Sequence, residues 1–226
     1  MILQRASLLL LSSMLLACSA NDPHRGAKTG ALVGGATGAL VGQQLGGRKG
    51  RFIGAAAGAI AGGLIGRFMD EQQQTLEKQL GQEQQEHKLE IERMPDDTLK
   101  LGLQNEVTFE FDSARLKPDL EPSLKKLAKV LKEYRQSVAH VVGFSDDQGS
   151  SEYNRLLSQR RAESIAAYLE SQGVEAARIR TEGRGELEPR ESNETEAGRR
   201  RNRRVEIYIR PIVQGKEAMA YERPRY

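Results

Sequence analysis

Residues 143–162 read GFSDDQGSSEYNRLLSQRRA, and this stretch decides the fold. An apolar run at 138–142 leads into a turn rich in acidic residues, Ser and Gly, and a helical pattern of apolar residues begins after Gly149. This order predicts a β-strand, a loop and an α-helix.

The predicted helix carries a positive charge inside its apolar stripe. At 100° per residue, a wedge of roughly 80° holds Asn154, Leu157, Arg161, Ile165 and Tyr168. A guanidinium cannot be deprotonated there, so it must reach water or an acidic partner. The nearest acidic candidate in the chain lies in the preceding loop, at position 146. A snorkelling side chain or a purely structural ion pair explains the same spacing.

A resemblance favours a binding role. Gly-x-Ser-Asp-x-x-Gly at 143–149, Asn154, and Leu-Ser-x-x-Arg-Ala at 157–162 resemble the signature of the OmpA-like C-terminal domain, the peptidoglycan-binding module of Gram-negative envelopes. The likeness covers residues 105–210 and includes FEFDSA at 109–114, GRGE at 183–186, Pro189, Asn193 and NRRVEI at 202–207. The chain departs from the usual His-Thr-Asp of the loop at Phe144 and Ser145.

The resemblance implies a ligand and its contacts. Asp146 is expected to accept a hydrogen bond from the ammonium of diaminopimelate in the stem peptide, and Arg161 to hold its carboxylate in a two-pronged contact. One fixed anion and one fixed cation suit a zwitterionic amino-acid end, because both contacts are charge-assisted. The residues expected at the peptidoglycan site are Ser145, Asp146, Asn154, Arg161, Asn202 and Arg203.

The pattern of residues 105–210 predicts an α+β fold, an OmpA-like βαβαββ sandwich with a mixed sheet and helices on one face. Strands are expected at 107–111, 138–142, 178–182 and 204–210, and helices at 120–134 and 150–171. Gly173 suits the C-terminal cap of the second helix, and Pro211 ends the last strand.

The N-terminus has the features of a lipoprotein signal. Arg5, a short apolar run and Leu15-Leu16-Ala17-Cys18 resemble a secretion signal that ends in a bacterial lipobox. Cys18 is the chain's single cysteine, so an intramolecular disulfide is impossible. The resemblance to a lipobox implies that Cys18 carries the lipid. By the same resemblance, Ser19, where a lipoprotein kept in the inner membrane usually carries Asp, implies sorting to the outer membrane, with the C-terminal domain in the periplasm.

Glycines recur at every fourth position from 26 to 66, with small and apolar residues between them. On a helix this spacing makes a bare stripe that allows close backbone contact, and the segment resembles a glycine-zipper domain. We expect a helical hairpin over 27–69, turning near residues 43–51. Each apolar half is shorter than the roughly 20 residues that a spanning helix requires. The hairpin therefore either enters the membrane partially or as a homo-oligomer, or packs on itself and on copies in the periplasm.

The remaining segments link these parts. A Gln- and Glu-rich stretch is expected to form a solvated helical spacer, and alternating residues on either side of Met94-Pro95-Asp96-Asp97 indicate a β-hairpin. The last residues show no periodicity and are expected to be loose. The predicted organisation is a signal peptide at 1–17, a lipidated tether at 18–26, the glycine hairpin at 27–69, the spacer at 70–87, the β-hairpin at 88–104, the OmpA-like domain at 105–210 and a tail at 211–226.

Composition disfavours several other functions. Aromatic residues make up 5%, Trp is absent and the formal net charge is only +3, so a nucleic-acid partner is not expected despite the arginines at 199–204. The three histidines lie in separate segments and no metal-ligand spacing, phosphate loop or nucleophile elbow occurs, so neither an enzyme nor a metal or other cofactor is expected. A stator-like ion channel subunit would need an acid within a membrane helix, and none lies between Ala27 and Met69.

Two functions remain in competition. The first is an outer-membrane lipoprotein that ties the membrane to peptidoglycan through Asp146 and Arg161. The second is an envelope assembly protein that oligomerises through the glycine hairpin, with wall binding only positioning it.

Overall fold

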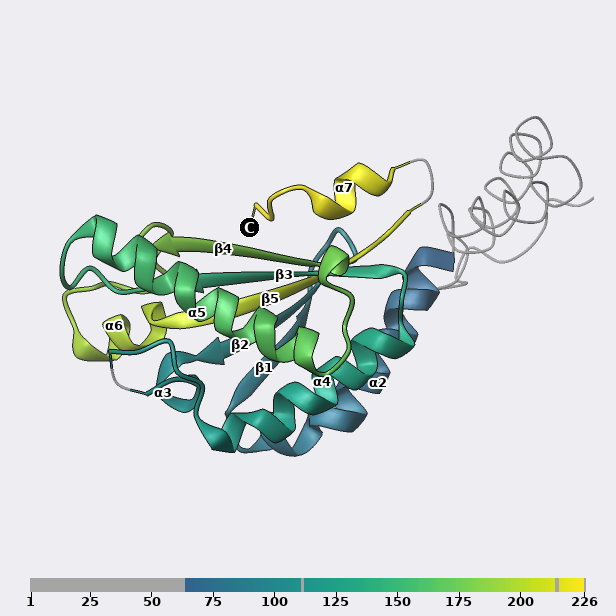
Figure 1. Ribbon diagram of the computed structural model, residues 1–226, viewed down its shortest axis with the longest axis horizontal. Coiled ribbons are helices and arrows are strands. Elements are labelled where there is room, and N and C mark those ends of the chain that lie inside the picture. Colours follow the sequence, from purple (N-terminus) through teal and green to yellow (C-terminus); the bar gives the residue numbers. More distant parts are fainter. Residues whose placement is uncertain (1–63, 111, 214–215, 226) are drawn as a thin grey trace, which may run out of the picture.

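The computed structural model describes residues 64–110, 112–213 and 216–225 (Figure 1). The expected signal peptide, the lipidated Cys18 and nearly all of the glycine hairpin lie outside the described residues.

A mixed five-stranded sheet forms the centre of the described chain, in the order β1-β2-β5-β3-β4. The β3–β4 pair is parallel, and the other three pairs are antiparallel. The strands are β1 (Leu89–Arg93), β2 (Leu99–Gln104), β3 (Ser137–Phe144), β4 (Ile179–Gly185) and β5 (Arg204–Pro211). The predicted α+β fold with a mixed sheet is confirmed.

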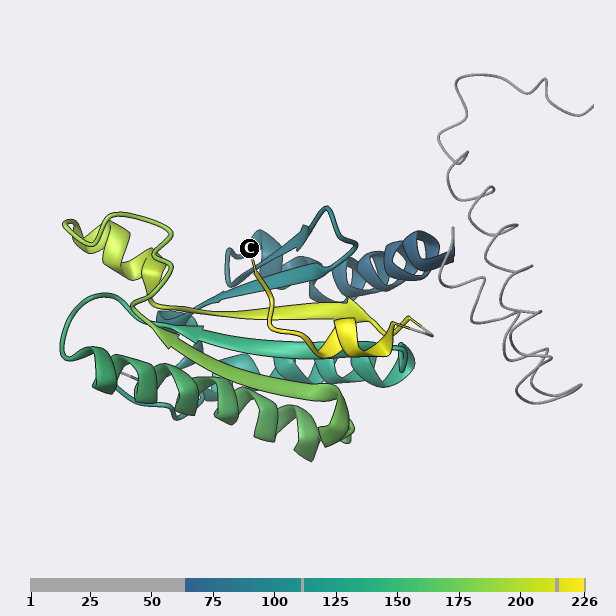
Figure 2. The same cartoon turned by 90° about the horizontal axis from the view of Figure 1, so that it is seen from above.

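Three long helices cover one face of this sheet: α2 (Ile65–Gln85), α4 (Glu121–Glu133) and α5 (Ser151–Ser171). Their apolar sides join the inward residues of all five strands in one core. Figure 2 shows α5 running along β3 and β4 for most of their length. Shorter elements complete the chain: α3 (Asn105–Thr108), the 3-10 turns Pro118–Leu120 and Ala176–Arg178, α6 (Glu196–Asn202) and α7 (Glu217–Tyr221).

Helix α2 corrects the expected solvated spacer. It begins at Ile65, inside the predicted glycine hairpin of residues 27–69, and buries Met69, Leu76 and Leu80 against the domain. Glu83 accepts hydrogen bonds from Ser123 and Lys126 of α4 at 3.2 and 2.6 Å. The sequence pattern predicted an exposed helix because α2 has few apolar side chains among its Gln and Glu residues. Spaced by four or seven residues, these few are enough to line a narrow contact with another helix.

The predicted β-hairpin is present, but the strand expected at 107–111 is not. Strands β1 and β2 pair with Leu89 opposite Leu103, and β2 continues the sheet by pairing with β5. This pairing fills the sheet position that a strand at 107–111 would need. The chain instead turns through α3, and Phe109 enters the core, 2% exposed, making only an isolated bridge to Leu116.

The contact between α5 and the sheet is unusually close at glycine. A Cβ on Gly143 of β3 would lie 2.1 Å from the Ser158 carbonyl oxygen, and one on Gly183 of β4 would lie 2.4 Å from the Gln159 amide nitrogen. Ser150 caps the start of α5 by accepting from the Tyr153 amide at 3.2 Å. Glycine at both strand positions therefore sets the distance between the sheet and the helix that carries Arg161.

The C-terminal tail is not loose over its described residues. Helix α7 packs on β3, and His140 Nε2 lies 2.7 Å from the Ala220 carbonyl oxygen. Helix α7 lies apart from α2, α4 and α5 in Figure 1. Arg184 donates to the Pro224 carbonyl, and Arg210 donates to that of Glu222 at 3.0 Å. These contacts are made by main-chain carbonyls, which leave no periodic pattern in the sequence.

Candidate functional site

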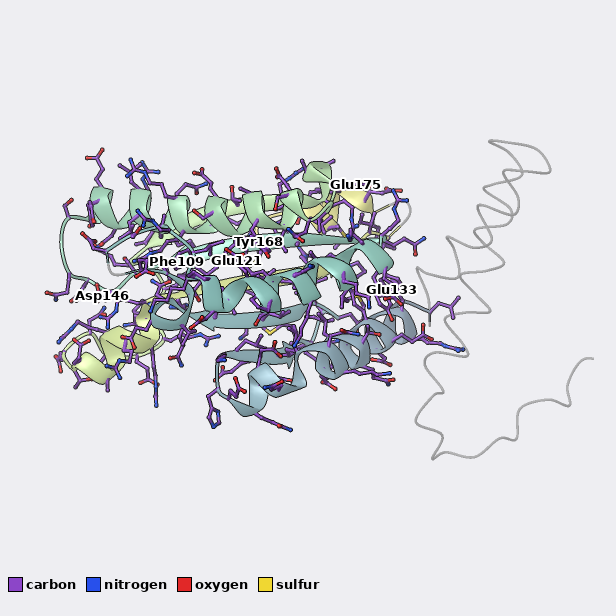
Figure 3. All side chains as sticks on the ribbon, turned by 60° about the horizontal axis from the view of Figure 1, so that its bottom comes forward. Phe109, Glu121, Glu133, Asp146, Tyr168 and Glu175 are labelled. Atoms are coloured by element: carbon purple, nitrogen blue, oxygen red, sulfur yellow. The ribbon has the colours of Figure 1, made fainter. Side chains whose placement is uncertain are left out.

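Five of the six residues expected at the ligand site line one cavity of about 460 Å³. It opens where β3 ends, between the following loop, the first half of α5, the α3 region and α6. Figure 3 shows Asp146 and Phe109, both in its lining, at the same end of the molecule. The five are Ser145, Asp146, Asn154, Arg161 and Arg203.

Asp146 is 6% exposed and held in one position by its own loop. Its Oδ1 accepts from the Gln148 amide at 3.2 Å, and its Oδ2 accepts from Arg203 Nη1 at 2.6 Å. Its carbonyl oxygen accepts from Ser145 Oγ at 2.8 Å and from Asn154 Nδ2 at 3.2 Å. Ser145 and Asn154 thus fix the main chain of the acidic residue.

Arg161 is also 6% exposed, and its partners are neutral. Its Nε donates to the Ser113 carbonyl at 2.9 Å, and its guanidinium carbon lies 5.4 Å from the centre of the Phe109 ring. Burial lowers the pKa of the Arg161 guanidinium while the nearby charge of Asp112 opposes that shift. The group stays charged, because arginine does not lose its proton in proteins.

Asp146 and Arg161 line the same cavity without an ion pair of 4.0 Å or less between these two described residues. The expectation that Arg161 finds its acidic partner in Asp146 is therefore wrong for the free protein. The carbonyl and the ring beside Arg161 satisfy it instead, and neither could be recognised as its neighbour from helical spacing.

Arg203 joins three acidic side chains at the cavity. Its guanidinium lies 2.6 Å from Asp146, 3.0 Å from Glu106 and 2.8 Å from Glu196. Burial alone would lower the pKa of Arg203, but the hydrogen bonds that its guanidinium donates to these three carboxylates outweigh burial and raise the pKa. Arg203 therefore ties the loop, α3 and α6 together around the opening.

Asn202 lies outside the cavity, which corrects its expected place at the ligand. It is completely buried; its Oδ1 accepts from the Arg190 and Glu191 amides at 2.8 and 3.0 Å. Its Nδ2 donates to the Glu191 carbonyl and to Asn193 Oδ1. Its side-chain amide therefore holds the 190–193 loop beside α6 and does not face the cavity.

Phe144, the departure from the family pattern, also lies away from the cavity. Its side chain is 1% exposed on the opposite face of the sheet, with the Arg204 guanidinium carbon 3.8 Å from its ring centre. The change at this position therefore alters the packing beneath the loop without removing a side chain from the cavity lining.

The sequence did not single out the rest of the lining. Its acidic members come mainly from the segment that follows β2, where a strand was expected. Phe109 could have been found, because it stands inside the FEFDSA motif, and the acids at 110 and 112 stand beside it. The further lining residues are Asn105, Glu106, Phe109, Glu110, Asp112, Gln148, Tyr153, Leu157 and Glu196.

Opposite charges in a partly apolar cavity suit a small zwitterion. Arg161 and Arg203 supply positive charge, Asp146 and its acidic neighbours supply negative charge, and Phe109 and Leu157 supply apolar surface. Across residues 64–110, 112–213 and 216–225, no group of three or more His, Cys, Asp or Glu side chains is placed to hold a metal ion. None of the helices described there is both long and apolar enough to cross a bilayer.

Two family models match this chain. The OmpA family model matches residues 108–203, and the YMGG-like Gly-zipper model matches residues 1–70. Among curated relatives, the probable lipoprotein YiaD of Escherichia coli is 46% identical over 116 residues, which are 51% of this chain and 53% of YiaD. The outer-membrane lipoprotein YfiB of Pseudomonas aeruginosa is 38% identical over 114 residues, which are 50% of this chain and 68% of YfiB. The chain spans about half the length of YiaD and of the Bordetella avium outer membrane protein A.

Solved structures share the fold. The cell wall anchor of the T6SS from Pseudomonas aeruginosa matches with a TM-score of 0.55 and 29% identity, covering 60% of this chain and 96% of that one. A putative MotB-like protein from Desulfovibrio vulgaris matches with a TM-score of 0.56 and 25% identity, covering 65% of this chain and 99% of that one. The residues that the OmpA family model matches include Asp146, Arg161 and Arg203 of the cavity.

Proposed function

The chain belongs to the OmpA family, and from this premise we propose that it is an outer-membrane lipoprotein that ties the membrane to the cell wall by binding peptidoglycan without a covalent bond. The observation that carries the proposal is the cavity in which Asp146 and Arg161 offer opposite charges, held apart by other partners. A relative named an outer-membrane lipoprotein, another named a probable lipoprotein and a neighbour named a cell wall anchor support the same function.

The ligand group that we propose is the zwitterionic end of diaminopimelate in the stem peptide. Asp146 accepts from its ammonium, and Arg161 donates to its carboxylate. A carboxylate has about four lone-pair sites, and Asp146 uses two of them on Gln148 and Arg203, so acceptor capacity remains for the ligand. Within the described part of the chain, Arg161 donates one hydrogen bond, from Nε, which leaves its other N–H groups for a carboxylate.

The membrane end of the proposal rests on Cys18. Lipid on this residue would hold the chain to the inner leaflet of the outer membrane, and residues 64–225 would lie in the periplasm within reach of the wall. More than one acyl chain is needed for stable anchoring, which a lipobox cysteine can supply.

Sedimentation with purified sacculi tests the binding assignment. The full chain in detergent should co-sediment, and the double variant Asp146→Ala, Arg161→Ala should not. The matched control is Asp147→Ala, Arg160→Ala, which removes the same two charges from exposed neighbouring positions outside the cavity. Equal sedimentation of wild type and the site variant would show that this cavity does not bind the wall.

A second candidate function, oligomerisation through the glycine hairpin, is favoured by the Gly-zipper match at residues 1–70. Cross-linking of wild type against Gly54→Leu and Gly58→Leu tests it, because a leucine side chain blocks close backbone contact. Unchanged oligomers would dismiss this function and leave the wall-binding proposal standing.

A further inference from the structure

Asn105 is a buried amide at the cavity that no group of the described chain satisfies. It is 4% exposed and lines the cavity of Asp146 and Arg161, and among the described residues neither its Nδ2 nor its Oδ1 finds a hydrogen-bond partner. Buried polar groups are nearly always paired in native proteins, and an unpaired one lowers the stability of the fold. Gln72, Glu83 and Arg93 each have one unpaired buried atom elsewhere in the described chain, whereas both side-chain polar atoms of Asn105 are unpaired, and Asn105 lies at the site where a ligand is proposed to bind.

Main-chain hydrogen bonds hold the backbone of Asn105 in place. The Asn105 amide nitrogen donates to the Arg203 carbonyl at 3.1 Å, and its carbonyl accepts from the Phe109 amide at 2.8 Å. Both backbone groups are therefore used, and the residue is tied at once to Arg203, which contacts Asp146, and to Phe109, which contacts Arg161. Asn105 lies between the two halves of the charged site.

The chemistry of the amide indicates what it recognises. Charged groups of a ligand already have charged partners in this cavity, whereas a carboxamide matches a neutral group with one donor and one acceptor. A peptide bond is such a group. The stem peptide presents one where diaminopimelate is joined to the rest of the chain, beyond its free zwitterionic end.

We propose that Asn105 recognises a peptide bond of the stem peptide, donating from Nδ2 to its carbonyl and accepting at Oδ1 from its N–H. This inference rests on the proposed function and deepens it, because it makes the site a reader of peptide-linked diaminopimelate. Free diaminopimelate has the same zwitterionic end but no peptide bond, so Asn105 gives the site a preference for wall material over the free amino acid.

Calorimetry on the full chain in detergent tests this with two probes, free meso-diaminopimelate and the tripeptide L-Ala–D-Glu–meso-diaminopimelate. Wild type should bind the tripeptide more tightly. Asn105→Leu, which is close to isosteric, should lose roughly thirtyfold in tripeptide affinity, the equivalent of two neutral hydrogen bonds, and less than about twofold for the free amino acid. The same variant should melt a few degrees higher, since it removes the unpaired amide.

Thr108→Val is the matched control. Thr108 is fully buried in the same turn and lies outside the cavity lining, and its hydroxyl donates to the Gln104 carbonyl at 2.7 Å. Its loss should lower the melting temperature and leave the preference for the tripeptide unchanged. Asn105→Ala repeats the binding measurement if the leucine variant does not fold.

The outcomes separate the two proposals. Equal loss on both probes, wild-type affinity for the tripeptide, or a lower melting temperature in Asn105→Leu would each overturn the role of Asn105 while sacculus binding stands. A wild-type chain that binds neither sacculi nor either probe would instead remove the proposed function, and the role of Asn105 with it.

Discussion

Replacing Gly143 by alanine tests whether the close contact between sheet and helix builds the binding site. The new methyl carbon would lie 2.1 Å from the Ser158 carbonyl oxygen and 2.8 Å from its carbonyl carbon. Real Cβ atoms essentially never come closer than 3.0 Å to such an atom. Because both neighbours are main chain, α5 must move away from β3 by about 0.9 Å, within the range of backbone shifts that overpacking causes.

The expected loss of stability is large for a single methyl group. Overpacking lowers the free energy of unfolding by up to about 3 kcal/mol. A clash with main-chain atoms belongs at the upper end of this range, because main chain cannot rotate away as a side chain can. For a domain of this size such a loss lowers the melting temperature by roughly 6–12 °C. Arg161 lies one turn after Ser158, so the same movement draws its guanidinium away from the loop of Asp146. We expect sacculus binding to weaken by roughly tenfold, as for the loss of one charge-assisted hydrogen bond.

Urea unfolding and sacculus sedimentation of the same preparations provide the assay, with Gly102→Ala as the control. Gly102 is also a strand glycine, in β2, but a Cβ there would meet only Glu90, at 3.9 Å or more. Its substitution should change the free energy of unfolding by less than about 0.5 kcal/mol. Stability and binding of Gly143→Ala within that margin of wild type would refute the reasoning.

Three further variants test separate parts of the fold. Leu76→Ala should cost about 2–5 kcal/mol in urea unfolding, since Leu76 is fully buried, whereas a solvated spacer helix would show almost no change. Arg204→Leu should cost about 1–3 kcal/mol, because Glu206, 2% exposed, keeps Arg190 and the Tyr208 hydroxyl but loses the hydrogen bond of 2.7 Å from Arg204 Nε; a loss below about 0.5 kcal/mol would contradict this role for the pair. Burial lowers the pKa of His140 below 6.5, although the hydrogen bond to the Ala220 carbonyl opposes the shift. The fold then keeps its full stability above about pH 6.5 and loses some as the pH falls below it, and His140→Gln should flatten this loss between pH 7 and 5 in thermal melts.

Local sequence signals were enough to predict the elements in which buried and exposed positions alternate with the period of a strand or a helix. The strand at 138–142, the helix after Gly149 and the β-hairpin each lie where alternation, helical period and a turn signal indicated. The strand expected at 107–111 failed for a reason of tertiary structure, because β2 takes the place beside β5. Alternation of Val107, Phe109 and residue 111 cannot tell a paired strand from a loop that buries one ring.

The site was predictable to the extent that its residues stand in motifs. Asp146 and Arg161 were located from the loop and helix pattern, and both reach one cavity. Their immediate partners were not predictable, since Ser113 contributes a carbonyl and Asn105 an amide from a segment about 40 residues or more away. The prediction placed Asn202 at the ligand because it stands in a motif. In the structure, its side chain is used entirely for hydrogen bonds to the 190–193 loop, which motif position alone does not reveal.

The separation of the two buried charges explains how the site could bind a zwitterion without first breaking a contact. Had Asp146 and Arg161 paired with each other, a ligand would have to replace that ion pair with two equivalent ones and would gain little. Instead, Arg203 compensates Asp146 from the side of α6, and a carbonyl with an aromatic ring holds Arg161 from the side of Phe109. Each charge therefore keeps a fixed position with unused hydrogen-bonding capacity, and the ordering of these side chains is already complete in the free protein. Such preorganisation raises affinity because binding then costs less conformational entropy.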